Sequence, residues 1–433
     1  MTDQDIVLNS FYKRTFFNSW LAGVQDNYHS LELITTDRCS LACKYCYFNK
    51  FGKELFTPES RNEDNIFEGF KKIIEWLTRN GYHPDIHFFS GEFFQQPINI
   101  KILDYFLDNL PPGIDFISIP VGGTFLLYNS GDVLIDYQKR FREKGVRLSF
   151  SLSVDGKYMD ENRPLRNKNL VRDDAYYDKV FKFAKATSSG FHPMVYAEGI
   201  QNWKKNFTWF QEKFKEFDIP WNNMYLLEVR NNNWTQQQFI DYAEFIEFLI
   251  FWTWDFVGKD KAKFIKTMLK SKSNFNILGN CFTTTGRGIG CGIQGNVHVR
   301  LGDLSIFPCH RLMKPFFKIG EFNVEDGKIT DVKAHNVELG VLIKSFDKRS
   351  LPVCETCLIK NLCAGQCLGS CHETHGDPFA PIPVVCQLFH IKVSTFVSAL
   401  KKINVYHEII GLLGHDKYNG FINLEEELCL RKK

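Results

Sequence analysis

Apolar and polar positions along residues 30–235 follow two alternating patterns. Short, mostly apolar runs that are typical of buried strands are each followed by a stretch whose apolar positions recur every three or four residues, as in an amphipathic helix. Repetition of this unit predicts an α/β protein with a parallel sheet or partial barrel. The expected strands are Leu31–Thr36, Ile86–Phe89, Asp115–Val121, Arg147–Val154, His192–Ala197 and Met224–Val229. Helices are expected within residues 57–80, 100–110, 132–143, 174–186 and 203–217.

The first of these helices carries clear end signals. Thr57 is expected to cap its N-terminus, and Pro58 suits its first turn. Asn80-Gly81 is expected to end it. Its predicted apolar face consists of Ile66, Phe67, Phe70, Ile73, Ile74 and Leu77.

Residues suited to binding follow the first four predicted strands. A three-cysteine loop follows the first strand, Ser90-Gly91-Glu92 follows the second, Gly122-Gly123-Thr124 the third and Asp155-Gly156 the fourth. In parallel strand–helix folds, ligands bind beyond the carboxyl ends of the strands. These loops are therefore expected to surround one pocket.

Composition and charge narrow the class of protein. The 433 residues are 44% hydrophobic and 24% charged, which excludes a disordered or fibrous chain. A net charge of +3 gives no reason to expect a nucleic-acid partner. The polar start Met1–Asp5 is unlike a signal peptide, and no apolar stretch suggests a membrane span, so a cytoplasmic protein is expected.

Thirteen cysteines in a reducing compartment point to metal or cluster ligation rather than to disulfides. The run Cys39-Ser-Leu-Ala-Cys43-Lys-Tyr45-Cys46 offers three thiolates, which suit zinc or an iron–sulfur cluster. A structural zinc needs four closed ligands, and a fourth would have to come from a distant part of the chain. Three thiolates on a [4Fe-4S] cluster leave one iron open to bind a small molecule.

This CxxxCxxC loop resembles the signature of the radical S-adenosylmethionine (SAM) superfamily, and Ser90-Gly91-Glu92 resembles its Gly-Gly-Glu segment with Ser90 in place of the first glycine. The resemblance implies a partial (β/α)6 TIM-like barrel, with Cys39, Cys43 and Cys46 as ligands of the SAM-binding cluster. It further implies SAM contacts from Tyr45, Ser90, Gly91, Glu92, Ser153 and Arg163. Glu92 would hold the methionine ammonium, Ser153 the ribose, and Arg163 the carboxylate.

A second group of cysteines resembles the SPASM domain, a C-terminal extension that carries two auxiliary [4Fe-4S] clusters. By this resemblance Cys354, Cys357, Cys363 and Cys386 hold the outer cluster. Cys291, Cys309 and Cys367 supply three ligands to the inner cluster, with Cys281 as the fourth and Cys371 as its competitor. A zinc-binding structural module is the alternative for the whole group.

The resemblance implies an oxidoreductase that cleaves SAM reductively and removes hydrogen from an unactivated C–H bond of a ribosomally made precursor peptide, with flavodoxin or ferredoxin as electron donor. A side-chain crosslink is the favoured product, and formylglycine formation of the sulfatase-maturase type is the alternative. A non-catalytic metal-binding or electron-transfer protein is the alternative of another class. The sequence assigns no residue to acid–base catalysis. Four ionisable residues are candidates, but no motif singles any of them out: Asp37, His87, Glu228 and Arg230.

The expected domain organisation has five parts. It comprises an N-terminal extension at 1–29, the barrel at 30–235, a helical linker at 236–280, the SPASM domain at 281–390 and a C-terminal helical extension at 391–433.

Overall fold

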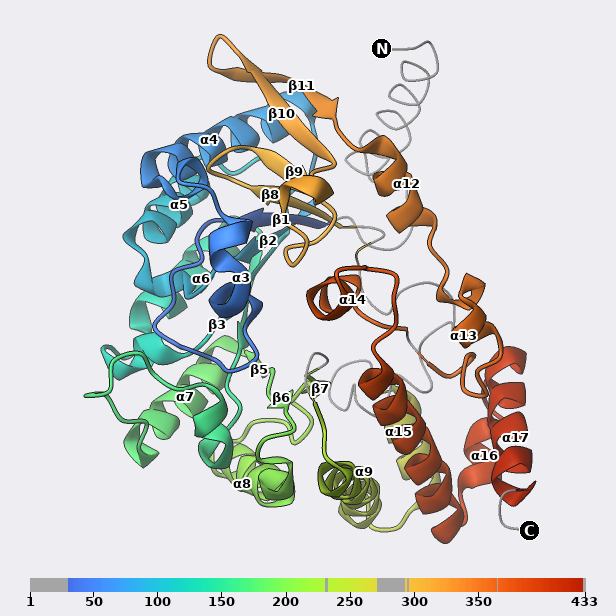
Figure 1. Ribbon diagram of the computed structural model, residues 1–433. Helices are drawn as coiled ribbons and strands as arrows, with labels where there is room; N and C mark the ends of the chain where they lie inside the picture. Colours follow the sequence, from blue (N-terminus) through green and yellow to red (C-terminus); the bar gives the residue numbers. More distant parts are fainter. Residues whose placement is uncertain (1–29, 230–232, 271–292, 294–295, 364, 431–433) are drawn as a thin grey trace. The chain divides into compact units, whose positions relative to one another are not determined.

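The computed structural model describes residues 30–229, 233–270, 293, 296–363 and 365–430 (Figure 1). These residues form two compact units. The first unit contains residues 30–154, 163–190 and 293–345, and the second contains 155–162, 191–270 and 346–430.

A mixed sheet forms the centre of the first unit. Its parallel strands are β1 (Ser30–Ile34), β2 (Asp85–Phe89), β3 (Phe116–Val121) and β4 (Arg147–Leu152). Beyond β1 the sheet continues through β8 (Val297–Arg300), β9 (Ser305–Phe307), β10 (Gly320–Glu325) and β11 (Lys328–Ala334). The strand order is β11-β10-β9-β8-β1-β2-β3-β4, followed by β5 (Gly190–Phe191) where the first unit ends. The predicted α/β fold with a parallel sheet at its core is therefore confirmed, and β8–β11 add antiparallel pairs at one edge.

Strand β8 pairs in parallel with β1, with Leu31 opposite Val297. The sequence pattern grouped residues 297–334 with the cysteine-rich region, whereas their backbone hydrogen bonds attach them to the edge of the first sheet. The reason is that β1, unlike β2 and β3, has no neighbouring strand from the first half of the chain on that edge.

Helices cover the sheet of the first unit, and α4, α5 and α6 lie side by side along it (Figure 1). The α-helices of this unit are α3 (Tyr47–Leu55), α4 (Glu63–Asn80), α5 (Pro97–Asp108), α6 (Asp132–Glu143), α7 (Asp174–Thr187) and α12 (Val337–Ser345). Short 3-10 helices are η2 (Glu59–Arg61), η3 (Phe93–Gln95), η4 (Thr124–Leu127) and η8 (Pro315–Phe317).

Helix α4 confirms one predicted end signal and corrects the other. It ends at Gly81, whose φ of 66° is left-handed, as the Asn80-Gly81 pair predicts. Its N-cap is Asn62, whose side chain accepts a hydrogen bond from the Asn65 N–H, so the prediction of Thr57 as the cap was wrong. The Thr57 hydroxyl instead accepts from the backbone N–H of Ser60, which starts the separate turn η2.

The second unit contains the remaining helices and the short parallel pair β6 (Met194–Val195) and β7 (Leu227–Glu228). Of the fifth predicted strand, His192–Ala197, only Met194–Val195 is a strand in the structure, and β5 lies just before the predicted range. Pro193 has no N–H to donate, and the Met194 N–H donates to the Asp155 carboxylate instead of to a neighbouring strand. The α-helices are α8 (Trp203–Glu216), α9 (Gln236–Phe256), α10 (Lys261–Lys270), α13 (Pro352–Glu355), α14 (Leu368–His375), α15 (Pro383–Lys402), α16 (Tyr406–Ile410) and α17 (His415–Leu430). Its 3-10 helices are η5 (Lys157–Asn162), η6 (Ile200–Asn202) and η9 (Lys348–Ser350).

Helix α15 is long and apolar enough to cross a membrane, with a mean hydropathy of 1.4 over its most apolar window. The expectation that the chain has no such stretch was therefore wrong for this helix. Half of the window is buried inside the protein, where α15 contacts α9. Its Lys392 is fully buried, and the Lys392 Nζ lies 2.8 Å from Glu228 Oε1, which also accepts a hydrogen bond from the Tyr242 hydroxyl. These contacts are those of a core helix.

The Glu228→Ala variant is expected to lose about 3–5 kcal/mol of stability, because the Lys392 ammonium would stay buried without its carboxylate. The urea unfolding midpoint of the second unit measures this loss. The matched control is Glu244→Ala, which removes an exposed pair with Lys204 and should cost about 0–1 kcal/mol. Equal midpoints for the two variants would show that the buried pair adds nothing.

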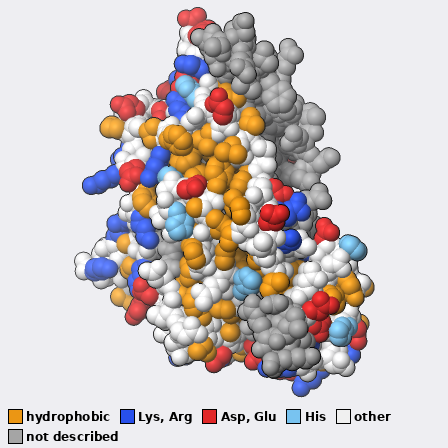
Figure 2. Space-filling view, turned by 45° about the vertical axis from the view of Figure 1, so that its right-hand side comes forward, with side chains coloured by type: hydrophobic (Ala, Val, Ile, Leu, Met, Phe, Trp, Pro, Cys, Tyr) orange, Lys and Arg blue, Asp and Glu red, His pale blue; other side chains and the backbone are white. Residues whose placement is uncertain are grey.

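Figure 2 shows charged side chains of both signs on one face of the molecule. On this face the described Lys and Arg side chains lie among Asp and Glu side chains.

Candidate functional site

The three-cysteine loop joins β1 to α3 in the first unit. Cys39, Cys43 and Cys46 are all partly buried, and Cys46 is the N-cap residue of α3. The Cys46 N–H donates to the Cys43 carbonyl at 3.1 Å, so the backbone turns tightly between these two ligands. Burial raises the pKa of the Cys39 thiol, which the neighbouring acidic groups raise further. A positively charged metal centre would offset this cost, because it holds coordinated cysteines as thiolates.

A segment that follows Arg163 in sequence braces this loop. The Ala42 N–H donates to the Pro164 carbonyl, and the Arg166 N–H donates to the Ser40 carbonyl, both at 2.8 Å. The Arg166 guanidinium also donates to the Cys39 carbonyl at 3.0 Å. The sequence pattern gave no sign of this brace, because it joins positions more than a hundred residues apart.

The Ser90-Gly91-Glu92 segment lies directly against the start of the cysteine loop. The Gly91 N–H donates to the Thr36 carbonyl at 2.7 Å and the Glu92 N–H to the Arg38 carbonyl at 2.9 Å. A Cβ atom on Gly91 would lie 2.2 Å from the Arg38 carbonyl oxygen, so this close approach requires glycine. The Ser90 hydroxyl lies 3.5 Å from the Asn99 amide nitrogen.

Glu92 is 1% exposed, and only one of its two carboxylate oxygens accepts a hydrogen bond from the described residues. Its Oε2 accepts hydrogen bonds from the Gly122 N–H at 2.8 Å and the Thr124 hydroxyl at 3.4 Å. None of the described groups donates to the buried Oε1. Burial raises the pKa of Glu92 to about 7, because these two hydrogen bonds compensate only in part for the loss of water. A buried carboxylate oxygen without a donor suits a ligand ammonium group.

The other residues expected to contact SAM lie near the cysteine loop or at the end of a parallel strand. The Arg163 guanidinium is buried and lies 5.3 Å from the centre of the Tyr45 ring. Ser153 directly follows β4, and its N–H donates to the Val121 carbonyl at 2.7 Å. Asp37, a candidate acid–base group, is instead paired with Arg61 at 2.8 Å in a structural ion pair.

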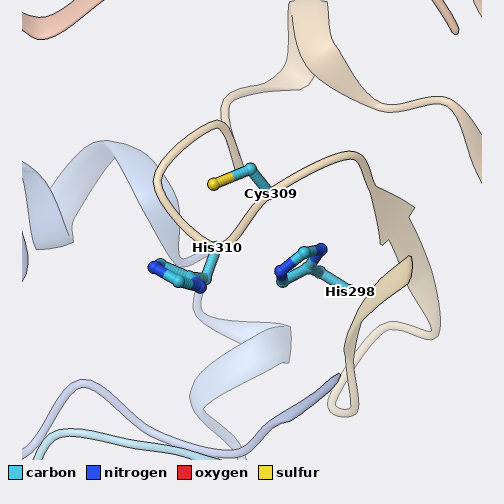
Figure 3. Close-up of side chains that lie close together, drawn as sticks. All are labelled: His298, Cys309 and His310. Atoms are coloured by element: carbon cyan, nitrogen blue, oxygen red, sulfur yellow. The ribbon is translucent and has the colours of Figure 1, made fainter. Parts of the chain in front are cut away.

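A second group of possible ligands in the first unit surrounds Glu32 of β1. His298, Cys309 and His310 offer ligand atoms that all lie within 4.8 Å of one another (Figure 3). Glu32 Oε2 lies 2.9 Å from His298 Nε2 and 3.0 Å from His310 Nδ1. Burial acts to raise the pKa of Glu32, but the two imidazoles overcome this and hold it well below its usual value. Burial lowers the pKa of His310.

The sequence pattern singled out Cys309 in this group but neither histidine. Val-His-Val in β8 and the Cys309-His310 pair are the signals that an interpretation could have used. Of the other residues expected at the inner cluster, Cys281 and Cys291 lie outside the described residues, and Cys367 is the N-cap residue of α14 in the second unit. The described residues therefore do not test this ligand set.

The four cysteines expected at the outer cluster do come together in the second unit. Cys354, Cys357, Cys363 and Cys386 line one cavity of about 310 Å³. Burial and the neighbouring thiols of Cys363, Cys354 and Cys357 together raise the pKa of Cys386 to about 11. Four thiolates suit both zinc and a [4Fe-4S] cluster, and a cavity of this size holds a group much larger than one zinc ion.

The first unit is therefore an α/β fold with a candidate binding site at the carboxyl ends of its parallel strands. Three cysteines that could hold a metal cluster lie in this site. Residues 33–196 match the family model described as the Radical SAM superfamily. This match spans the cysteine loop, the Ser90–Glu92 segment and Arg163, so the segment is a radical SAM domain. The expectation of SAM and a [4Fe-4S] cluster at this site follows from the family and agrees with the unpartnered Glu92 oxygen.

Solved structures of anSMEcpe share the fold, and a structure of SuiB is a weaker match. Native anSMEcpe with bound AdoMet has a TM-score of 0.52 and 17% identity, covering 87% of this chain and 99% of that chain. Native anSMEcpe with bound AdoMet and Kp18Cys peptide has a TM-score of 0.53 and 18% identity, covering 87% and 99%. Streptococcus suis SuiB bound to precursor peptide SuiA has a TM-score of 0.47 and 12% identity, covering 83% and 75%. No curated protein matches the sequence of the chain.

The Glu92→Gln variant is expected to bind SAM about 10- to 150-fold more weakly, because a hydrogen bond to a charged group contributes about 1.5–3 kcal/mol. The glutamine side chain keeps the shape of the glutamate and its acceptor for the Gly122 N–H, but not the charge. Equilibrium dialysis of the cluster-loaded protein with labelled SAM measures the change. Unchanged affinity would exclude Glu92 as the partner of the ammonium.

The affinity of the wild-type protein for SAM is expected to rise as the pH is raised from about 6 to about 7.5. With a pKa of about 7, Glu92 is mostly protonated at the lower pH and gains its charge across this range. The amino group of SAM stays largely protonated there, since α-amino groups titrate at about 7.7–8.0. The same dialysis repeated across this range checks the prediction, and Glu92→Gln should lose the dependence.

Proposed function

We propose that the chain is a radical SAM peptide maturase of the SPASM type, in which a 5'-deoxyadenosyl radical removes hydrogen from a precursor peptide. The observation that carries the proposal is the pairing of the three-cysteine loop with Glu92, whose buried Oε1 has no described donor. The shared fold with anSMEcpe, which was solved with AdoMet and a peptide, supports a peptide as substrate.

Each residue of the first site has a proposed role. Cys39, Cys43 and Cys46 would hold the [4Fe-4S] cluster that binds SAM. Glu92 holds the SAM ammonium and Arg163 its carboxylate, for which a guanidinium fork is well shaped. Ser153 bonds the ribose, and the backbone at Tyr45, Ser90 and Gly91 lines the bound molecule. When bound, the cluster and SAM supply the radical, and the protein supplies orientation and excludes water.

The second cysteine cavity extends the proposal to an auxiliary cluster. Cys354, Cys357, Cys363 and Cys386 would hold the outer [4Fe-4S] cluster in the cavity that they line. Cys281, Cys291, Cys309 and Cys367 are the proposed inner ligands, which brings the total to three clusters. A substrate radical that must lose a second electron can pass it to such a cluster, so these centres favour a crosslink or a dehydrogenation. Reduced flavodoxin or ferredoxin in the cytoplasm is the proposed electron donor.

Formylglycine formation on a sulfatase is the second candidate, favoured by the fold shared with the anSMEcpe structures at TM-scores of 0.52 and 0.53. A non-catalytic metal carrier is less consistent with the site, because a carrier has no use for Glu92 beside an open cluster position.

Anaerobic co-expression with a small peptide encoded beside the gene tests the proposal. The expected result is a loss of two hydrogens per event, absent with the Cys43→Ala variant. Tandem mass spectrometry separates the products, since a crosslink suppresses fragment ions between the joined residues and an aldehyde changes a single residue. An unchanged peptide mass, together with modification of a sulfatase-motif peptide, would overturn the crosslinking proposal in favour of the second candidate.

A further inference from the structure

The cavity lined by the four cysteines is also lined by Gln366, which is not a cluster ligand but contacts one of the cysteine sulfurs. Gln366 lies between Cys363 and Cys367 of the motif, and its Nε2 donates to the Cys386 sulfur at 3.0 Å. On the same turn the Gly365 N–H donates to the Cys363 sulfur at 3.3 Å. Two of the four thiols thus already receive N–H donors from this turn.

The backbone of Ile382 fixes the orientation of the Gln366 amide. The Ile382 N–H, which can only donate, lies 2.6 Å from Gln366 Oε1, and the Ile382 carbonyl, which can only accept, lies 3.1 Å from Nε2. An amide flipped by 180° would oppose both groups, so the nitrogen is the atom that faces Cys386. The donor is therefore held in place before any metal centre binds.

Cys371 completes this arrangement. It is 2% exposed, and its thiol donates to Gln366 Oε1 at 3.6 Å. Cys371 also lines the cavity, and this contact places its sulfur beside the Gln366 amide.

A hydrogen bond donated to a cluster sulfur stabilises the more negative, reduced form more than the oxidised form, and so raises the reduction potential. The effect is larger where little water or other polar group competes. The lining of the whole cavity is mostly apolar and includes Leu351, Leu358, Phe379, Pro381 and Phe389, with Lys348, Lys360 and His390 as its charged or ionisable members. The Gln366 amide is uncharged at all working pH values, so its contribution does not depend on protonation.

We infer that Gln366 is a positioning residue that raises the reduction potential of the outer cluster through its hydrogen bond to Cys386, and so makes this cluster an electron acceptor. The inference rests on the proposed function, because it requires a [4Fe-4S] cluster on Cys354, Cys357, Cys363 and Cys386. It concerns one equilibrium, in which the oxidised cluster takes up one electron and no atom is transferred.

The test is a redox titration of the cluster-loaded full chain, followed by electron paramagnetic resonance. The signal of the outer cluster is identified as the one that Cys357→Ala removes. Gln366→Leu removes the donor at similar size, and Gln366→Glu places a carboxylate oxygen toward Cys386 while another still accepts from Ile382. The matched control is Gln211→Leu, which removes a partly buried amide that donates to the Trp221 carbonyl at 2.9 Å away from the cysteines.

The expected result is a shift of the outer-cluster midpoint to more negative potential in Gln366→Leu, a larger shift in Gln366→Glu and none in Gln211→Leu. An unshifted midpoint in Gln366→Leu with iron content unchanged would overturn the inference. Loss of the cluster in both Gln366 variants would also overturn it, by showing a purely structural role. If the wild-type protein has no paramagnetic signal that depends on Cys357, the proposal of an outer cluster is wrong. This result is distinct from an unshifted midpoint, which contradicts only the role of Gln366.

Discussion

The Cys43→Ala variant is expected to fold normally and to release no 5'-deoxyadenosine. Cys43 lies on a partly exposed loop, and alanine keeps the backbone bonds that shape it, including those from the Cys46 and Ala42 N–H groups. What is lost is one of three thiolates, and a cluster that lacks a ligand cannot hold SAM in place for cleavage. The effect on SAM cleavage should therefore be complete, whereas the effect on stability should be small.

Three measurements check this result under anaerobic conditions: circular dichroism for folding, iron and sulfide content, and 5'-deoxyadenosine by liquid chromatography. Lys44→Ala is the matched control, because it changes an exposed residue of the same loop and keeps all three thiols. Its SAM cleavage should equal that of the wild type. SAM cleavage by Cys43→Ala at the wild-type rate would show that the loop is not part of the active site. Zinc in place of iron and sulfide in the purified protein would favour a structural zinc site.

The Cys357→Ala variant is expected to keep SAM cleavage and to lose all modification of the peptide. Cys357 lines the cavity of the second unit, so its replacement removes a ligand of the outer cluster and leaves the loop of the first unit unchanged. If the substrate radical must pass an electron to this cluster, the reaction stops after hydrogen removal. Uncoupled 5'-deoxyadenosine should then accumulate without product.

Iron content, 5'-deoxyadenosine and peptide mass measured on one sample separate these steps. About four irons per chain should be lost, since one cluster of that size disappears. Thr356→Ala, a change at the neighbouring exposed residue, should leave all three readouts unchanged. Peptide modified at the wild-type level by Cys357→Ala would show that the outer cluster is dispensable.

Local signals predicted the elements whose causes are local. The strands up to residue 152 and the end of α4 at Gly81 depend on apolar runs and on a left-handed glycine, which are readable from neighbouring residues. The cap of α4 was misplaced because Thr57 and Asn62 are both residues that can cap a helix, and the Thr57 hydroxyl is used in the intervening turn η2. The shortening of the fifth predicted strand to Met194–Val195 involves the distant Asp155 carboxylate, which no local pattern contains.

The same distinction holds for the sites. The cysteine loop and Glu92 were predicted because their spacing is distinctive, but the state of Glu92 was not, since it depends on Gly122 and Thr124 from another strand end. Glu32 and His310 are 278 residues apart and meet only through folding. Gln366 was overlooked because the orientation of its amide depends on the backbone of Ile382, 16 residues away, rather than on its own neighbours.

The parallel pairing of β1 with β8 has a consequence for the order in which the protein can fold. During synthesis β1 can pair with β2 as soon as both have emerged, yet its other edge waits for residues 297–300. Until then the nascent sheet presents the unpaired backbone groups of a buried, apolar strand, the kind of edge that joins other chains into aggregates. A fragment cut at residue 235 would keep that edge permanently, so the first two hundred residues of this chain depend on its later part to avoid aggregating with other copies.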